Sequence, residues 1–230
     1  MIVLGIDTST DVLGVALVAE DETRFSSSTR GRYIHSERLF PAIDSALERA
    51  GVAKGDVDLL AVAVGPGSFT GIRIGMAAAK ALAYALQIPV VGVSTADVLA
   101  QPLGDEGWAC PVITARRGEV YWRLYRDGRA VGDHRAGPEE ELLASLAGRG
   151  PVVFTGDRAA EPAFRRAARA RLGEDASFVE PSLCHPQATA LCRLGLEAYR
   201  RGEPSDPLSL RPVYVRRSQA EVLWEARRRG

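Results

Sequence analysis

The first half of the chain alternates between short apolar runs and longer stretches in which apolar residues return at helical spacing. The helical spacing predicts helices over 36–50 and 71–86. The apolar runs predict strands at 1–7, 12–19, 22–29, 57–65 and 89–93. The third of these strands is the most polar, so we expect it near a sheet edge. The order is βββαβα, followed by one more strand.

The first predicted helix carries its own start and stop signals. Ser36 is expected to cap its amino end, and Gly51 is expected to end it. Its apolar positions include Leu39, Phe40 and Ile43, which we expect on one buried face.

The second half repeats the order of the first. Asp127 and Gly128 form a strong hairpin signal between two of its strands. Strands are predicted at 108–115, 119–126, 130–136, 151–156 and 176–181, and helices at 138–149, 157–170 and 187–201. Two βββαβα halves predict an α/β protein with a pair of mixed sheets flanked by helices, which meet at a cleft.

Composition excludes several classes of protein. Of the 230 residues, 46% are hydrophobic and 25% are charged, which is typical of a globular chain with a packed core. The longest uncharged stretch, 81–96, contains Gln87 and Pro89 and is shorter than a membrane helix requires. The amino terminus lacks the basic segment of a secretory signal. The cysteines are Cys110, Cys184 and Cys192, an odd and widely spaced set typical of reduced thiols, so we expect a cytoplasmic protein without a membrane segment.

Charge is balanced over the whole chain but not along it. There are 29 basic and 29 acidic side chains, which argues against a general nucleic-acid coat protein. Residues 1–115 carry 13 acidic and 8 basic groups, and residues 116–230 carry 16 acidic and 21 basic groups. The last 20 residues hold six arginines, among them Arg216, Arg217 and 227–229, which could contact tRNA or remain solvated.

A glycine-rich turn, 65–71 (GPGSFTG), lies between a predicted strand and a helix, where backbone amides can hold an anion. It matches neither the phosphate-loop nor the dinucleotide motif, so Gly65 and Gly67 could equally serve a tight turn. Asp7, Thr8 and Ser9 end the first strand, at the edge where ligand sites of α/β proteins gather. These five residues are the candidates for a nucleotide site, and an ATP-binding kinase or ATPase is the alternative function that they leave open.

The helix after this turn carries a stripe of small residues at a spacing of four. Gly71, Gly75, Ala79 and Ala83 would let another helix approach closely. The helix is apolar nearly all round, which indicates burial in the core of the chain or against a partner. The pattern does not decide between the two.

Evidence for catalysis or for a metal site is sparse. His35 has no second ligand one helical turn later, where Leu39 stands. Cys184, His185 and Cys192 match no zinc spacing. The pattern shows no nucleophile paired with a base, so we predict no catalytic residue and no metal ligand.

Five segments occur together in an order that resembles one family. They are GIDTST at the amino end, GPGSFTGIRIG, PVVGVSTADVLA, RRGEVYW at 116–122 and RPVYVR at 211–216. Together they resemble the TsaB family of bacterial tRNA threonylcarbamoyladenosine synthesis, over nearly the whole chain.

This resemblance implies an actin-like ATPase (ribonuclease H-like) fold and a protein without catalysis of its own. It implies a heterodimer with the paralogue TsaD, which holds the metal and transfers the threonylcarbamoyl group to the adenosine next to the anticodon. It also implies that TsaE joins the pair, that ATP and a divalent metal belong to the partner subunits, and that tRNA binds through the complex. We expect lobes at 1–103 and 104–230.

The resemblance also places the partner surface on helices of the first lobe, and isolated members are expected to form homodimers through it. A large residue such as Gly75→Trp would then leave a folded monomer. Relatives often carry an aspartate where this chain has Thr114, so any role of that aspartate is not carried over. The implied interface residues are Phe69, Gly71, Ile72, Gly75, Met76, Ala79 and Ala83.

Overall fold

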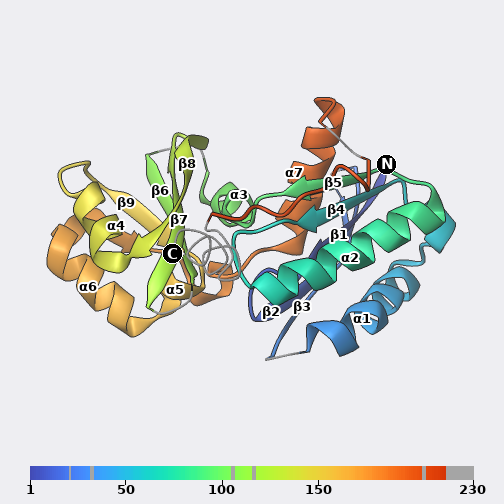
Figure 1. Cartoon of the computed structure of the whole chain (residues 1–230), viewed down its shortest axis with the longest axis horizontal. Coiled ribbons are helices and arrows are strands. Elements are labelled where there is room, and N and C mark those ends of the chain that lie inside the picture. Colours follow the sequence, from blue (N-terminus) through green and yellow to red (C-terminus); the bar gives the residue numbers. More distant parts are fainter. Residues whose placement is uncertain (21, 32–33, 105–106, 116–117, 204–205, 216–230) are drawn as a thin grey trace, which may run out of the picture.

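The computed structural model describes two lobes, each built around one five-stranded sheet (Figure 1). The described residues are 1–20, 22–31, 34–104, 107–115, 118–203 and 206–215. The predicted arginine-rich tail, 216–230, therefore lies outside them, as do Arg116 and Arg117 of the RRGEVYW segment. No helix within these ranges is both long and apolar enough to cross a membrane.

The first sheet has the strand order β3-β2-β1-β4-β5 and confirms the predicted βββαβαβ sequence of elements. Its first three strands are antiparallel neighbours, whereas β4 and β5 run parallel to β1. The polar strand β3 lies at an edge, as predicted. The strands are β1 (Ile2–Asp7), β2 (Val12–Ala19), β3 (Glu22–Arg30), β4 (Leu59–Ala63) and β5 (Val90–Val93).

The second sheet repeats this topology with the order β10-β9-β6-β7-β8. Its first three strands are again antiparallel neighbours, and β9 and β10 run parallel to β6. The strands are β6 (Trp108–Thr114), β7 (Glu119–Arg126), β8 (Arg129–Pro138), β9 (Val152–Thr155) and β10 (Ala176–Phe178). The repeated arrangement confirms the prediction of two similar α/β lobes.

Helices cover both faces of each sheet. On the first sheet, α1 (His35–Ala50) and α2 (Phe69–Leu86) bury one apolar face of the strands. On the second sheet, α4 (Glu139–Leu146) and α6 (Pro162–Leu172) do the same, and α5 (Asp157–Ala160) lies between β9 and α6. Short 3-10 helices occupy Lys54–Asp56, Gln101–Leu103, Gly173–Asp175 and Pro181–Leu183.

The remaining face of each sheet is covered by a helix that follows the other sheet in the chain. Helix α3 (Thr95–Ala100) follows β5 and packs against β6 and β7 of the second sheet. Helix α7 (Ala188–Arg200) follows β10 and packs against β1, β2 and β4 of the first sheet (Figure 1). The predicted division at 103 and 104 falls between the sheets, but α7, which it assigns to the second lobe, packs on the first.

Two predicted helix caps are wrong. Helix α1 begins at His35, its N-cap residue is Ile34, and no side chain caps it; the buried His35 ring lies with Nε2 2.8 Å from the carbonyl oxygen of Thr10. Ser36 therefore lies inside the helix. Asp157 does not cap a long helix either, since its Oδ1 accepts a hydrogen bond of 3.0 Å from the backbone N–H of Thr114.

The helix predicted over 157–170 is divided in two. Glu161 is extended between α5 and α6, because the ring of Pro162 disfavours a helical conformation at the residue before it. Phe40, predicted on the buried stripe of α1, is 49% exposed instead.

Candidate functional site

The end of β1 is bound tightly to the start of α2. Thr8 and Ser9 are completely buried. Thr8 Oγ1 donates a hydrogen bond of 2.7 Å to the carbonyl oxygen of Gly71, and the Ser68 N–H donates one of 2.7 Å to the carbonyl oxygen of Ser9. The backbone of Ser9 also passes so close to Gly67 that a Cβ there would lie 2.2 Å from the carbonyl oxygen. The glycine-rich turn therefore needs Gly67 for contact with the chain's own backbone.

Asp7 lies beneath this contact and is 1% exposed. Its Oδ1 accepts hydrogen bonds from the N–H and Oγ of Ser9, at 2.8 and 2.7 Å. Its Oδ2 has no hydrogen-bond partner among the described residues. Burial raises the pKa of Asp7, with the Ser9 hydrogen bonds acting in the opposite direction. The carboxyl group thus stabilises the turn after β1 and does not reach solvent.

A cavity of about 360 Å³ lies between the lobes. The amino ends of α1 and α2 meet there, and Thr114 and Asp157 close it from the second lobe. Its hydroxyl groups come from Ser9, Thr10, Ser36, Ser68, Thr70 and Thr114. This is the cleft that the repeated topology predicts.

The charges around this cavity do not form a phosphate cradle. The ionisable side chains in its described lining are the imidazole of His35 and the carboxyl groups of Asp11 and Asp157. Burial, followed by smaller effects that include the charge of Asp11, raises the pKa of Asp157. The amino ends of the helices attract an anion, whereas the two carboxyl groups repel one. Of the five residues predicted as a nucleotide site, Ser9 lines the cavity, and Asp7, Thr8, Gly65 and Gly67 do not.

The small-residue stripe of α2 faces the first sheet of the same chain. A Cβ on Gly71 would lie 2.0 Å from the Thr8 carbonyl oxygen, and one on Gly75 would lie 2.3 Å from Thr8 Oγ1. Phe69 is half-buried. The other residues of the predicted interface are buried within the chain: Gly71, Ile72, Gly75, Met76, Ala79 and Ala83. The chain's own residues therefore cover most of the surface of those six residues while α2 stays on its sheet.

The outer face of α2 carries a different stripe. Arg73, Ala77 and Ala81 are exposed at a spacing of four residues, and Tyr84 follows them, 82% exposed. This face therefore presents small side chains followed by one large exposed aromatic ring. The sequence signal for this face was present in the apolar pattern, but the neighbouring glycine stripe obscured it.

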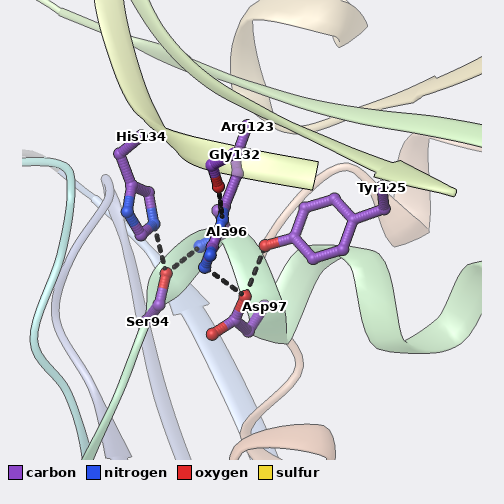
Figure 2. A network of polar contacts seen from close by, with 7 residues as sticks. All are labelled: Ser94, Ala96, Asp97, Arg123, Tyr125, Gly132 and His134. Atoms are coloured by element: carbon purple, nitrogen blue, oxygen red, sulfur yellow. Dashed lines mark hydrogen bonds and ion pairs between the residues drawn. The ribbon is translucent and has the colours of Figure 1, made fainter. Parts of the chain in front are cut away.

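A polar network joins the segment after β5 to the second sheet (Figure 2). Asp97 of α3 accepts hydrogen bonds from the Tyr125 hydroxyl and from Arg123 Nη1, the latter at 3.3 Å. Ser94 Oγ lies 2.8 Å from His134 Nε2 on β8. The network therefore connects the lobes through side chains that are 26 to 40 residues apart.

Ser94 and His134 stand at the distance of a nucleophile and its base, a pair that the sequence pattern did not show. Burial and the charge of Arg123 lower the pKa of His134, which favours its neutral form. Ser94 is nevertheless buried, and its Oγ accepts the Ala96 N–H at 3.2 Å as the cap of α3. We therefore assign the pair to the contact between the lobes.

The cysteines and histidines do not assemble a metal centre in the described part of the chain. Cys110, Cys184 and Cys192 are all buried and unpaired as disulfides. Among the described residues there is no group of three or more His, Cys, Asp or Glu side chains that could hold a metal ion.

Comparison with known proteins gives one consistent result. The family model for TsaD, described as tRNA N6-adenosine threonylcarbamoyltransferase, matches residues 32–224. The tRNA threonylcarbamoyladenosine biosynthesis protein TsaB of Bacillus subtilis is 33% identical, over 97% of this chain and 98% of its own length. TsaB of Escherichia coli is 31% identical, over 98% and 97%.

Solved structures agree with these relatives. YeaZ from Pseudomonas aeruginosa is 31% identical and superimposes with a TM-score of 0.77, over 93% of this chain and 99% of its own. The activator of 2-hydroxyisocaproyl-CoA dehydratase from Clostridium difficile shares 8% identity and a TM-score of 0.56, over 93% of this chain and 100% of its own, which shows a common fold alone. These likenesses confirm the actin-like α/β fold.

Proposed function

The chain belongs to the TsaB family, and from that premise we propose that it is a non-catalytic subunit in the synthesis of threonylcarbamoyladenosine in tRNA. In this proposal it binds the paralogue TsaD as a heterodimer and activates it. The hydrogen bonds of the candidate nucleotide-site residues support a non-catalytic role. Asp7, Thr8 and Ser9 direct most of their polar groups to the turn after β1 and the start of α2.

The observation that carries the docking proposal is the outer face of α2. Tyr84 is 82% exposed beside Ala77 and Ala81. Alanines let a partner helix approach closely, and tyrosine is among the residues that contribute most to interfaces. We therefore place TsaD on this exposed face of α2, which is separate from the face that carries the buried glycine stripe.

Docking can activate TsaD by favouring its active conformation. A partner that binds one conformation more tightly shifts the population toward it, by no more than the difference in binding free energy. The remaining assignments follow from the family and are part of the same proposal. TsaE joins the pair, ATP and the divalent metal are held by the partner subunits, and tRNA binds through the complex in the cytoplasm. The isolated chain forms homodimers through the same outer face.

The test replaces Tyr84 by glutamate, which places a charge in the centre of the proposed interface. The variant should stay folded, because the side chain is exposed, and should bind purified TsaD at least tenfold more weakly in calorimetry. Val131→Glu is the matched control, since Val131 is an exposed apolar residue on β8 of the other lobe, 42% exposed. Wild-type affinity of Tyr84→Glu for TsaD, or failure of the wild-type chain to bind TsaD, contradicts the proposal.

An ATP-binding kinase or ATPase is the second candidate, and the cavity between the lobes favours it. The phosphates of ATP would meet the carboxyl groups of Asp11 and Asp157 there, so binding would depend on a divalent cation between them. This candidate requires nucleotide turnover by the isolated chain with Mg²⁺. We expect none above the background of an Asp157→Ala variant.

A further inference from the structure

Arg73 on the outer face of α2 is held by two aromatic rings. Its guanidinium carbon lies 3.7 Å from the centre of the Phe69 ring. Its Nε donates a hydrogen bond of 3.2 Å to the hydroxyl of Tyr214. The rings of Phe69 and Tyr214 are themselves 5.6 Å apart and tilted by 31°. The guanidinium plane is therefore fixed by a residue one turn earlier on the helix and by a residue 141 positions later.

Tyr214 is placed there by buried contacts of the carboxyl-terminal segment, 206–215. Leu210 is 7% exposed and belongs to the core beneath α1 and α2. The Val213 N–H donates a hydrogen bond of 2.8 Å to the Val64 carbonyl oxygen, just after β4. The Val213 carbonyl oxygen lies against Gly65, where a Cβ would be only 3.2 Å away. The segment thus crosses the glycine-rich turn and ends beside α2.

The charge of Arg73 is not balanced by a neighbour in the described part of the chain. No ion pair within 4.0 Å involves Arg73 there, and its Nη1 and Nη2 make no hydrogen bond among those residues. The first turn of α2 contains no acidic residue, so the positive end of the helix dipole adds to the local potential. A cation near the amino end of a helix is unfavourable for the helix, so the position of Arg73 indicates a role other than stabilising α2.

A guanidinium group whose Nε is held, and whose two amino groups have no partner among the described residues, matches a carboxylate in shape and charge. Two parallel N–H···O bonds can form, and stacking on an aromatic ring reduces the freedom lost on binding. Arg73 also begins the outer stripe of α2, with Ala77, Ala81 and Tyr84 following on the same side. A group that binds Arg73 would therefore lie at the edge of the face proposed for TsaD.

We propose that Arg73, positioned by Phe69 and Tyr214, receives a carboxylate side chain of the docked TsaD subunit. The carboxyl-terminal segment is then part of the partner interface, although it lies more than a hundred residues from α2 in sequence. This inference rests on the proposed function and specifies how its partner is recognised.

The test measures the affinity of purified TsaD for four variants at low and moderate salt. Arg73→Ala should weaken binding about 10- to 100-fold and reduce its salt dependence, as expected for the loss of charge-assisted hydrogen bonds. Arg73→Lys should lose most of this affinity, because lysine cannot supply the stacked planar fork. Tyr214→Phe should weaken binding because the hydroxyl that holds Nε is lost. The effect should be only a few-fold, because the aromatic ring remains.

Arg149→Ala is the matched control. Its guanidinium lies 5.1 Å from the Trp108 ring, and its Nε donates a hydrogen bond of 2.8 Å to the Ser145 carbonyl oxygen, but it lies on the other lobe. Its affinity for TsaD should equal that of the wild type. Scanning acidic residues of TsaD in double-mutant cycles with Arg73→Ala should reveal one non-additive pair.

The outcomes separate this inference from the proposed function. If wild type binds TsaD and Arg73→Ala binds equally well, the inference is overturned and the proposed function stands. The carboxylate assignment is overturned if substituting each acidic residue of TsaD changes the binding free energy additively with Arg73→Ala. It is also overturned if Arg73→Ala impairs only tRNA binding by the assembled complex. If the wild type does not bind TsaD, the proposed function fails, and the inference fails with it.

Discussion

Replacing Gly75 by alanine should destabilise the isolated chain. The added methyl group would lie 2.3 Å from Thr8 Oγ1, inside the distance at which atoms overlap. Thr8 is completely buried and uses that oxygen in its 2.7 Å hydrogen bond to the Gly71 carbonyl oxygen. Either the hydrogen bond breaks or α2 moves away from β1, and both disturb the core of the first lobe.

The size of the effect follows from three opposing contributions. Overpacking a buried site costs about 1–3 kcal/mol. Loss of a buried hydrogen bond costs about 0.5–1.5 kcal/mol. Alanine stabilises a helix interior by about 1 kcal/mol relative to glycine. The net loss in free energy of unfolding is about 0.5–3.5 kcal/mol, which lowers Tm by about 1–14 °C in a chain of this length.

Urea unfolding followed by circular dichroism measures this loss, with Gly55→Ala as the matched control. A Cβ on Gly55 meets nothing within 4 Å, so that variant should unfold like the wild type. In a Thr8→Ala background, which removes Oγ1, the cost of Gly75→Ala should fall. A Gly75→Ala variant as stable as wild type, or an equal cost in both backgrounds, refutes the reasoning. The same contact changes the expectation for Gly75→Trp: because the larger side chain has even less room, this variant should be destabilised instead of forming a folded monomer.

Two further predictions concern titratable groups. Because burial raises the pKa of Asp7 above its ordinary value of 3.8, the stability it contributes is present below about pH 4 and is lost as pH rises through the raised pKa. Asp7→Asn keeps an oxygen that can accept the Ser9 hydrogen bonds. In urea unfolding this variant should be more stable than the wild type at pH 7, and the difference in the free energy of unfolding should narrow toward pH 4. A difference that does not change with pH contradicts this prediction. Burial also raises the pKa of Cys192 to about 12, so iodoacetamide at pH 8 should leave Cys192 unmodified in the native chain and label it in urea, as intact mass would show. Rapid native labelling at Cys192 would contradict the burial of its thiol between α7 and the first sheet.

The strands were the most predictable part of the fold. Continuous apolar runs such as 57–65 correspond to strands with both faces covered, and the polar third strand occupies an edge. Both halves carry this pattern in the same order, so the sequence alone predicted two lobes of one topology. Helix starts were less predictable, because the start of α1 depends on the contact between His35 and Thr10, 25 residues away in sequence.

The candidate site was predicted in part. Gly71 and Gly75 were recognised as positions of close approach and Gly67 as part of a tight turn or an anion site, but the sequence left open whether the chain's own core or a partner packs against the stripe. The structure shows that Thr8 of the same chain does so, and that Ser9 lies against Gly67. The contact of Arg73 with Tyr214, and that of Ser94 with His134, had no sequence signal, since each joins residues far apart in the chain.

Local periodicity thus determined the order of the strands and of the longer helices, but it missed α3 and the division of 157–170 into α5 and α6. The family motifs, which are contiguous in sequence, determined the relationship to TsaB. Only the tertiary structure decided what each apolar side packs against: α7 on the first sheet, α3 on the second, and the glycine stripe of α2 on β1 instead of a partner. The physical reason is that the hydrophobic effect depends on the apolar area buried and not on which surface buries it. The path of the whole chain therefore selects the surface that covers each apolar face.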